Sequence, residues 1–538
     1  MQKKLIKVQA EDNVAIALVD LEQGERVDFQ GEEIIIISNT KAKHKIAYVD
    51  FAIDDPIYMY GVLVGKAVFF IKKGDLLTTE NVKHQSSKVE GKTKSISWNA
   101  PDITNWRDRI FMGYHRADGQ VGTQNVWLFF PLVFCENRNI EVLKDVFEKE
   151  LSMGKDRKQR QLLRNLINGN DTGFKEEIQQ PEEQTFDNVD VKFITHQGGC
   201  GGIRQDSRIL AKLLAGYVKN PNVAGATVLS LGCQNLQIDL FKDALNALDS
   251  NLDKTVLIYE QQQMGTVDEM LNTIIKDSFE GIKKANEIER KPASIIKLKL
   301  GLECGGSDGF SGISANPALG YASDILATVG GSPILSEFPE LCGVEQELVN
   351  RCVNNSDAER FISLMQTYEE SAEASGSGFD MNPSPGNIKD GLITDAMKSA
   401  GAAKKGGTSP IEAILDYGEY VTKPGLNLLC TPGNDVESTT GMVGSGANIV
   451  VFTTGLGTPT GNPIAPVLKV SSNTILAERM PDIIDIDTGA VIRGEKTIQE
   501  MGEEILEYVI QVASGKIEAK ADILDQDDFI PWKRGVSL

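Results

Sequence analysis

The residues best suited to chemistry in this sequence stand between Gly301 and Gly320, in the stretch GLECGGSDGFSGISANPALG. Cys304, Ser307 and Asp308 offer a thiol, a hydroxyl and a carboxylate beside paired glycines, which let backbone N–H groups approach a ligand closely. The apolar run over 295–300 predicts a buried strand just before them. A strand that ends in a glycine-rich loop is the usual ligand site of open α/β domains. The alternative is a tight turn with a buried cysteine.

Similar loops follow three predicted strands after residue 189. HQGGCGG carries His196 and Cys200, LGCQN carries Cys233, and EQQQMG carries three glutamines. The helices expected after these strands span 206–218, 238–247 and 266–288. Strands that alternate with helices predict a parallel sheet with right-handed crossovers. The polar loops therefore stand at the carboxyl ends of the strands.

The loop cysteines Cys200, Cys233 and Cys304, together with His196, are candidate metal ligands. No CxxC or HxxxH spacing is present, so the pattern does not indicate a structural zinc site. Packing as a small buried hydrophobic side chain is the alternative for each cysteine. The loop TTGLGTPTGNP lacks the lysine of a P-loop and the glycine spacing of a dinucleotide site, which argues against nucleotide binding.

Residues 1 to about 90 consist of short alternating runs between turns, which predict a small all-β domain. Two of the four histidines in the chain fall here: His44, at the entrance to a strand, and His84, shortly after Glu80. The alternative for each histidine is a surface or capping role. The polar segment over 86–108 has no periodicity and predicts an extended linker.

Length and composition limit the protein class. A chain of 538 residues predicts about three domains. A net charge of −21 argues against nucleic acid or an anionic membrane as partner, so an anionic substrate needs a local cationic pocket. Scattered cysteines, no signal-peptide pattern and no bilayer-length apolar run favour a reducing compartment, and we expect a cytoplasmic location.

The remaining pattern completes the expected organisation. Asp118 and Gly119 indicate a hairpin, and the apolar run over 126–135 indicates a strand buried on both faces. The charged segment over 152–188 is expected on the surface. Further helices are expected over 140–151, 317–329, 356–375 and 497–514. The domains expected are 1–92 (β), 93–110 (linker), 111–290 (central α/β) and 291–538 (C-terminal α/β).

Several motifs together resemble those of the altronate/galactarate dehydratase family, and the resemblance covers almost the whole chain. The order and spacing of CGGSD and NPSPGN are its most specific part, and the ending WKRGVSL is more similar to the altronate branch. The motifs are GYHRADGQVGTQN (113–125), HQGGCGG (196–202), LGCQN (231–235), the stretch over 301–320, ILSEFPELCGVE (334–345), NPSPGN (382–387), TPGND (431–435) and TTGLGTPTG (453–461).

The resemblance implies a fold and an activity. The first domain would have the SAF (β-clip) fold, and two mainly parallel α/β domains would form the dehydratase body. The activity would be a hydro-lyase reaction on D-altronate that yields 2-dehydro-3-deoxy-D-gluconate. It requires removal of the C2 proton beside a carboxylate and loss of the C3 hydroxyl. The family depends on a divalent metal, typically Fe2+ or Mn2+, and no organic cofactor is needed.

The resemblance also implies roles for particular residues. His44 belongs to the element that the family places at its active site, and His196 is the second acid/base candidate. Glu80, Cys200 and Cys304 are candidate metal ligands. The candidate substrate-binding residues are Lys45, Arg116, Ser307, Asp308, Asn316 and Asn387. We expect a small anionic sugar acid as partner, and a homo-oligomer.

Two positions depart from the family pattern. The HxHN motif that altronate enzymes carry after the first domain's last strand is replaced here by Thr78, Glu80 and Asn81. The family's GCEN is GCQN here, with Gln234 in place of a carboxylate. Three alternatives remain: dehydration of galactarate or another sugar acid, loss of a sulfonate group as in related sulfo-lyases, and sugar-acid binding without catalysis.

Overall fold

The N-terminal part is a small antiparallel β domain, as predicted. The computed structural model describes residues 3–152, 158–168 and 185–538. Exposed and buried residues alternate in Arg26–Phe29 and Pro56–Met59, so one face of each strand enters the domain core. The sheets are β1-β2-β5 (Leu5–Ile6, Val14–Ala17, Lys45–Ala47), β3-β4 (Arg26–Phe29, Glu32–Ile35) and β6-β7-β8 (Pro56–Met59, Val62–Ala67, Val82–Lys83).

A three-stranded antiparallel sheet joins the two α/β regions. Its strands are β10 (Val121–Gly122), β9 (Ile110–His115) and β15 (Lys291–Ser294). The hairpin predicted at Asp118 and Gly119 is confirmed, because β9 and β10 pair antiparallel on either side of it. Since β15 pairs with β9, the chain returns to the same place after the central region.

The central region is a four-stranded parallel sheet with order β12-β11-β13-β14 (Asp190–Phe193, Val126–Pro131, Val223–Ser230, Thr255–Glu260). Its helices are α1 (Asn137–Glu150), α2 (Lys158–Ile167), α3 (Arg204–Lys219), α4 (Ile238–Leu248) and α5 (Val267–Ala285). Much of the segment over 152–188, expected on the surface, lies outside the described residues.

The C-terminal region is built on a seven-stranded parallel sheet with order β18-β19-β17-β16-β20-β21-β22 (Ile411–Leu415, Leu426–Leu429, Ser332–Leu335, Lys299–Cys304, Ile449–Thr454, Val467–Ser471, Ile486–Asp487). Its helices are α6 (Ala315–Val329), α7 (Glu345–Arg351), α8 (Asn355–Ala374), α9 (Pro385–Lys389), α10 (Asp395–Ala402), α11 (Asp435–Gly444), α12 (Thr474–Arg479), α13 (Gly489–Arg493), α14 (Ile498–Ala513) and α15 (Lys520–Ile523). The two parallel sheets confirm the predicted fold class.

The strand predicted over 295–300 is displaced. Residues Ile295–Lys297 form a 3-10 turn, because the Ser294 hydroxyl accepts a hydrogen bond from the Ile296 N–H, and β16 starts only at Lys299. Ile295, Leu298 and Leu300 are nevertheless fully buried. The predicted helices agree with the observed ones to within one turn.

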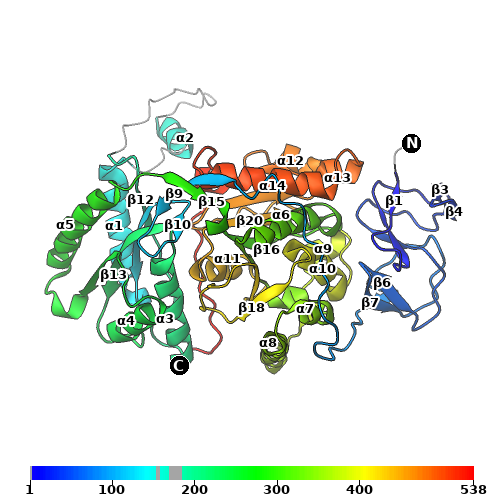
Figure 1. Ribbon diagram of the computed structural model, residues 1–538, viewed down its shortest axis with the longest axis horizontal. Helices are drawn as coiled ribbons and strands as arrows, with labels where there is room; N and C mark the ends of the chain where they lie inside the picture. The colour runs from blue at the N-terminus through cyan, green and yellow to red at the C-terminus, as the bar shows by residue number, and fades with distance from the viewer. Residues whose placement is uncertain (1–2, 153–157, 169–184) are drawn as a thin grey trace.

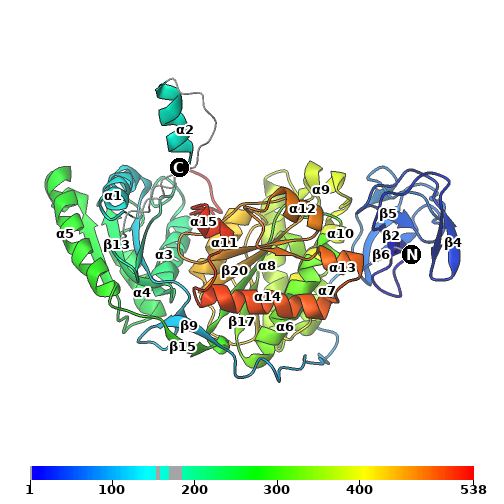
Figure 2. The same ribbon diagram turned by 90° about the horizontal axis from the view of Figure 1, so that it is seen from above.

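The order of the parts in space differs from their order in the sequence. The C-terminal region lies between the N-terminal β domain and the central region (Figures 1 and 2). The chain end returns to the central region, where the Leu538 N–H donates to the Gly201 carbonyl at 2.7 Å. One buried apolar cluster spans the β domain and the C-terminal region, and another spans the central and C-terminal regions. Among the described residues, no helix has the length and apolar character needed to cross a bilayer.

A buried cluster of carboxylates, lysines and a thiol as the candidate active site

The candidate site forms at the carboxyl end of β16, in the middle of the largest sheet. Successive strand residues point to opposite faces, so Glu303 and Cys304 enter two different sides of the core. The Glu303 carboxylate accepts a hydrogen bond from the Ser438 hydroxyl of α11 at 2.7 Å. The Cys304 thiol donates to the Glu340 carboxylate at 3.2 Å, and its sulfur lies 2.9 Å from the Lys405 ammonium nitrogen.

Glu337 links the two sides of the cluster. It follows β17 in a left-handed conformation (φ 64°, ψ 60°), which is costly for a residue with a side chain and often marks a functional position. Its own N–H donates to the Thr431 hydroxyl at 2.8 Å, which holds this conformation. Its carboxylate accepts hydrogen bonds from the Cys304 N–H and the Lys405 ammonium group.

Two lysines supply the positive charge of the cluster. Lys405, in the 3-10 turn after α10, is 1% exposed and pairs with Glu337, while Lys398 of α10 lies 2.6 Å from Glu340. Burial alone would lower the pKa of Lys405, but Cys304, Glu337 and the neighbouring carboxylates raise it well above its usual value. Both lysines are therefore ammonium ions, and Glu337 and Glu340 each have a cationic partner.

The cluster contains closely spaced ligand atoms, some without hydrogen-bond partners, and these suit a divalent cation. Two donor groups have ligand atoms that lie within 4.8 Å of one another, and both contain Glu337: Cys304, Glu337 and Glu340, and Glu303, Glu337 and Asp435. One buried oxygen of Glu303 and one of Glu337 have no hydrogen-bond partner. Burial raises the pKa of Asp435 to about 7 and, together with Glu337, raises the pKa of Glu303. Since a cation would relieve this repulsion, the residues present fit a divalent metal.

Gly305 lets Asp435 approach this group. A Cβ atom at Gly305 would lie 2.1 Å from Asp435 Oδ2, so any side chain here would displace the carboxylate. The close approach of a side chain from α11 thus explains Gly305, whereas Gly306 adopts a positive φ of 59°.

The N-terminal β domain contacts the same loop. Lys43 lies 2.9 Å from Asp308, and Lys45 donates to the Gly391 carbonyl at 2.6 Å. The His44 Nε2 lies 3.1 Å from the Lys389 carbonyl. Burial lowers the pKa of His44 below its usual 6.5, so the imidazole is neutral at pH 7. The chain over 43–45 therefore lies against both the glycine-rich loop and the segment after NPSPGN.

Other predicted residues of this loop hold the scaffold. Asp308 Oδ1 accepts hydrogen bonds from the Ser311 and Ser472 hydroxyls, while its Oδ2 faces Lys43. The Asn387 amide donates to the Ser307 carbonyl at 2.7 Å. Asn316 donates to the Gly401 carbonyl and accepts from the Thr453 hydroxyl. Their buried amides are satisfied by protein groups, which positions the loop.

The structure does not bring the remaining predicted residues to this cluster. His196 is buried beside the central sheet, where Nε2 donates to the Pro131 carbonyl at 2.7 Å and Nδ1 accepts from the Gly198 N–H. Arg116 binds the Pro221 carbonyl and Asn125 next to the hairpin. Glu80 is exposed and Cys200 is half-buried, and neither belongs to a donor group found among the described residues.

The positions of the family's HxHN motif form a turn here. The Thr78 N–H donates to the Asn81 side chain, whose amide donates to the Leu76 carbonyl at 2.9 Å.

Several residues of the cluster were not assigned from the sequence. Glu303 stands directly before Cys304, and Glu337 and Glu340 follow the short apolar run SPIL (332–335), so their positions at strand ends were a usable signal. Lys398 and Lys405 lie on a helical segment without a motif. Only the packing of that segment against β16 and β17 reveals them.

Family profiles match the three regions in the same order as the fold. The Altronate/galactarate dehydratase SAF domain matches 3–85, the second domain of D-galactarate dehydratase/Altronate hydrolase matches 113–286, and the C-terminal region of D-galactarate/Altronate dehydratase matches 295–537. The β domain and the two parallel-sheet regions thus correspond, in order, to the SAF domain and the two-part body of a hydro-lyase. The chain belongs to the altronate/galactarate dehydratase family.

Named relatives are similar over nearly the full length. An altronate dehydratase of Bacillus subtilis is 33% identical and covers 100% of both chains, and an altronate dehydratase of Escherichia coli is 32% identical and covers 99% of both. A galactarate dehydratase (L-threo-forming) of Escherichia coli is 31% identical over 96% of this chain and 94% of its own. The identities are nearly equal for two sugar acids, so they assign the hydro-lyase class and not the substrate.

Proposed function

We propose that this protein dehydrates D-altronate to 2-dehydro-3-deoxy-D-gluconate. The observation that carries the proposal is the cluster around Glu337, where carboxylates, a thiol and two ammonium groups are buried at the end of β16 beside the β domain. Two of the three relatives described above are named for altronate, and the ending WKRGVSL is similar to that branch.

Lys43 of the β domain provides the attraction that an acidic protein otherwise lacks, whereas burial lowers the pKa of Lys45 to about 7 and so reduces its charge at neutral pH. The net charge of −21 repels an anionic sugar acid at long range. Lys43 is partly exposed beside Asp308, and Lys45 is buried against the Gly391 carbonyl. We assign these two residues to the substrate carboxylate, with Ser307 of the loop facing its hydroxyl groups and Asp308 positioning Lys43.

His44 is assigned to proton transfer at C2 or at the C3 oxygen. Its neutral imidazole is able to accept a proton at pH 7, and the Lys389 carbonyl fixes its Nε2. The base must reach the carbon next to the carboxylate, so a residue between the two lysines is well placed. His196 has no such role in this assignment, because the backbone engages both of its ring nitrogens.

A divalent metal, Fe2+ or Mn2+, is the cofactor that fits the donor set. Glu303, Glu337 and Asp435 offer oxygen, and Cys304 offers sulfur, which Fe2+ tolerates. When bound, the cation would supply Lewis-acid stabilisation of the charge that develops on the substrate carboxylate. Lys398 helps to lower the pKa of Glu340, while Lys405 opposes the increase that burial and Glu340 cause in the pKa of Glu337.

The test is a metal-reconstituted assay. Metal-free protein is loaded anaerobically with Fe2+, Mn2+, Mg2+ or Zn2+, and 2-keto-3-deoxy acid formation is followed with D-altronate, galactarate and other aldonates. The proposal expects the highest kcat/KM with D-altronate and Fe2+ or Mn2+. A clear preference for galactarate would reassign the substrate within the family. Tight binding of sugar acids without product would indicate a non-catalytic protein and overturn the proposal.

A further inference from the structure

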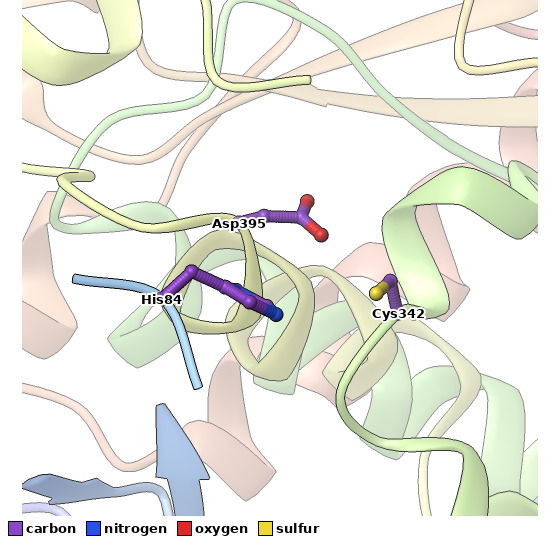
Figure 3. Close-up of side chains that lie close together, drawn as sticks. All are labelled: His84, Cys342 and Asp395. Atoms are coloured by element: carbon purple, nitrogen blue, oxygen red, sulfur yellow. The ribbon is translucent and has the colours of Figure 1, made fainter. Parts of the chain in front are cut away.

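A second group of metal-binding side chains lies outside the candidate active site. His84, Cys342 and Asp395 place a histidine nitrogen, a cysteine sulfur and a carboxylate oxygen within 4.8 Å of one another. In Figure 3 the three side chains point toward a common space from three separate segments. His84 follows β8 of the N-terminal domain, Cys342 follows the 3-10 turn after β17, and Asp395 begins α10.

The environment of the Asp395 carboxylate indicates that a ligand binds in this space. Its side chain is 1% exposed, and neither carboxylate oxygen makes a hydrogen bond of normal geometry. A buried carboxylate without a cationic partner is costly, and here burial raises its pKa to about 8 although the Cys342 thiol opposes the increase. The nearest charged neighbours do not resolve this: Lys398 already pairs with Glu340, and Glu345 adds negative charge.

We propose that His84, Cys342 and Asp395 bind one zinc ion at the boundary between the N-terminal β domain and the C-terminal region. Imidazole, thiolate and carboxylate are all ligands that zinc accepts, and a thiolate disfavours Mg2+ and Ca2+. Three protein ligands leave one position for water. Zinc binding would displace the proton of the Cys342 thiol, so the affinity of the site for zinc increases with pH.

The position of this ion predicts a structural role. One ligand comes from the β domain and two from the C-terminal region, so the ion fixes the β domain onto the body. The same two segments carry the active-site cluster: Glu340 stands two residues before Cys342, and Lys398 stands one helical turn after Asp395. The ion therefore sets the position of the segment over 43–45 relative to the cluster. This site is separate from the carboxylates around Glu337, and binding there is measured without any assay of the dehydration.

The test compares metal content and spectra of single variants of the full chain. Protein stripped with chelator is loaded with zinc, dialysed and measured by elemental analysis. The proposal expects Cys342→Ser to retain at least one equivalent less zinc than wild type, with affinity at the lost site reduced at least about 100-fold. His84→Gln should behave in the same way. The exposed-cysteine variant Cys233→Ser is the matched control, and Glu337→Gln should keep the zinc that Cys342→Ser loses.

Cobalt substitution reports directly whether a thiolate is among the ligands. Cobalt-loaded wild type should show a thiolate-to-cobalt charge-transfer band, which persists in Cys304→Ser and disappears when Cys342→Ser is added to that variant. Absence of the band in wild type would overturn the proposal. So would its loss only in Cys304→Ser, or equal zinc in wild type and Cys342→Ser.

Discussion

The Lys405 ammonium nitrogen lies 2.9 Å from the Cys304 sulfur, although 101 residues separate them in the sequence. The same nitrogen pairs with Glu337, so one buried cation contacts both the thiol and the carboxylate that the two metal-donor groups share. Burial and the adjacent carboxylates raise the pKa of Cys304 well above its usual value, so without a metal the sulfur is a neutral thiol. Lys405 therefore offsets the negative charge of the carboxylates, and a substitution at this position removes that compensation.

Removal of Lys405 should destabilise the protein and abolish activity. Lys405→Met leaves Glu337 buried without its cation, and breaking such a pair costs about 3–5 kcal/mol. Urea unfolding should show this loss, while the neighbouring half-buried Lys404→Met should unfold like wild type. Equal stability of the two variants would contradict a stabilising ion pair between Lys405 and Glu337.

Glu337→Gln should separate metal binding from folding. The substitution keeps the size of the side chain and removes the carboxylate that both donor groups share. We expect active-site metal affinity to decrease more than about 100-fold, with a corresponding loss of turnover. Metal titration followed by calorimetry measures the change, and Glu373→Gln on the exposed part of α8 is the control. Unchanged metal affinity would exclude Glu337 as a ligand.

His44→Gln should reduce kcat by about 10²–10⁴-fold and remove an ionisation from the pH profile. Because the pKa of His44 is lowered, the neutral base persists below pH 6.5, and the acid limb of kcat/KM should lie below that value in wild type. His115→Gln is a close control, because the Nε2 of His115 also lies 3.1 Å from a backbone carbonyl, in an exposed position. Identical pH profiles for wild type and His44→Gln would rule out a proton-transfer role.

His196 should affect stability and its pH dependence. Burial lowers its pKa to about 4 in the folded protein, against 6.5 unfolded, so the unfolded state binds the extra proton as pH falls. Above pH 6.5 the protonation of His196 contributes nothing to the free energy of unfolding. Below that pH it opposes folding, by about 2 kcal/mol at pH 5. The difference in urea midpoint between pH 7.5 and pH 5 should be smaller for His196→Gln than for wild type. A large loss of kcat without loss of stability would instead support catalysis.

Gly305→Ala should disturb the metal-donor group without changing any ligand. The added methyl group would lie 2.1 Å from Asp435 Oδ2, so the carboxylate or the loop must move. We expect reduced metal content and reduced turnover. Gly386→Ala, whose Cβ would have only ordinary contacts at 3.6 Å, should be close to wild type. Wild-type metal content in Gly305→Ala would show that Asp435 is not a ligand.

The sequence by itself determined the fold class and most helix positions. Periodicity locates α3, α4 and α14 because their buried faces recur with the helical period. It also located the glycine-rich loop after β16, since strand, glycines and polar groups are adjacent in the chain. The motifs of that loop identified the family together with NPSPGN and the other motifs along the chain.

Only the tertiary structure decided which residues meet. Cys304, Glu337 and Lys405 come from three segments whose contact depends on the pairing of β16 with β17 and on the helix that covers them. His196 had the type and the loop position of a catalytic residue, but its ring nitrogens satisfy buried backbone groups. The local sequence pattern specifies where a strand ends, because a strand end depends on residues that are neighbours in the chain. The partner of a buried charge depends on long-range packing, which the local pattern does not contain.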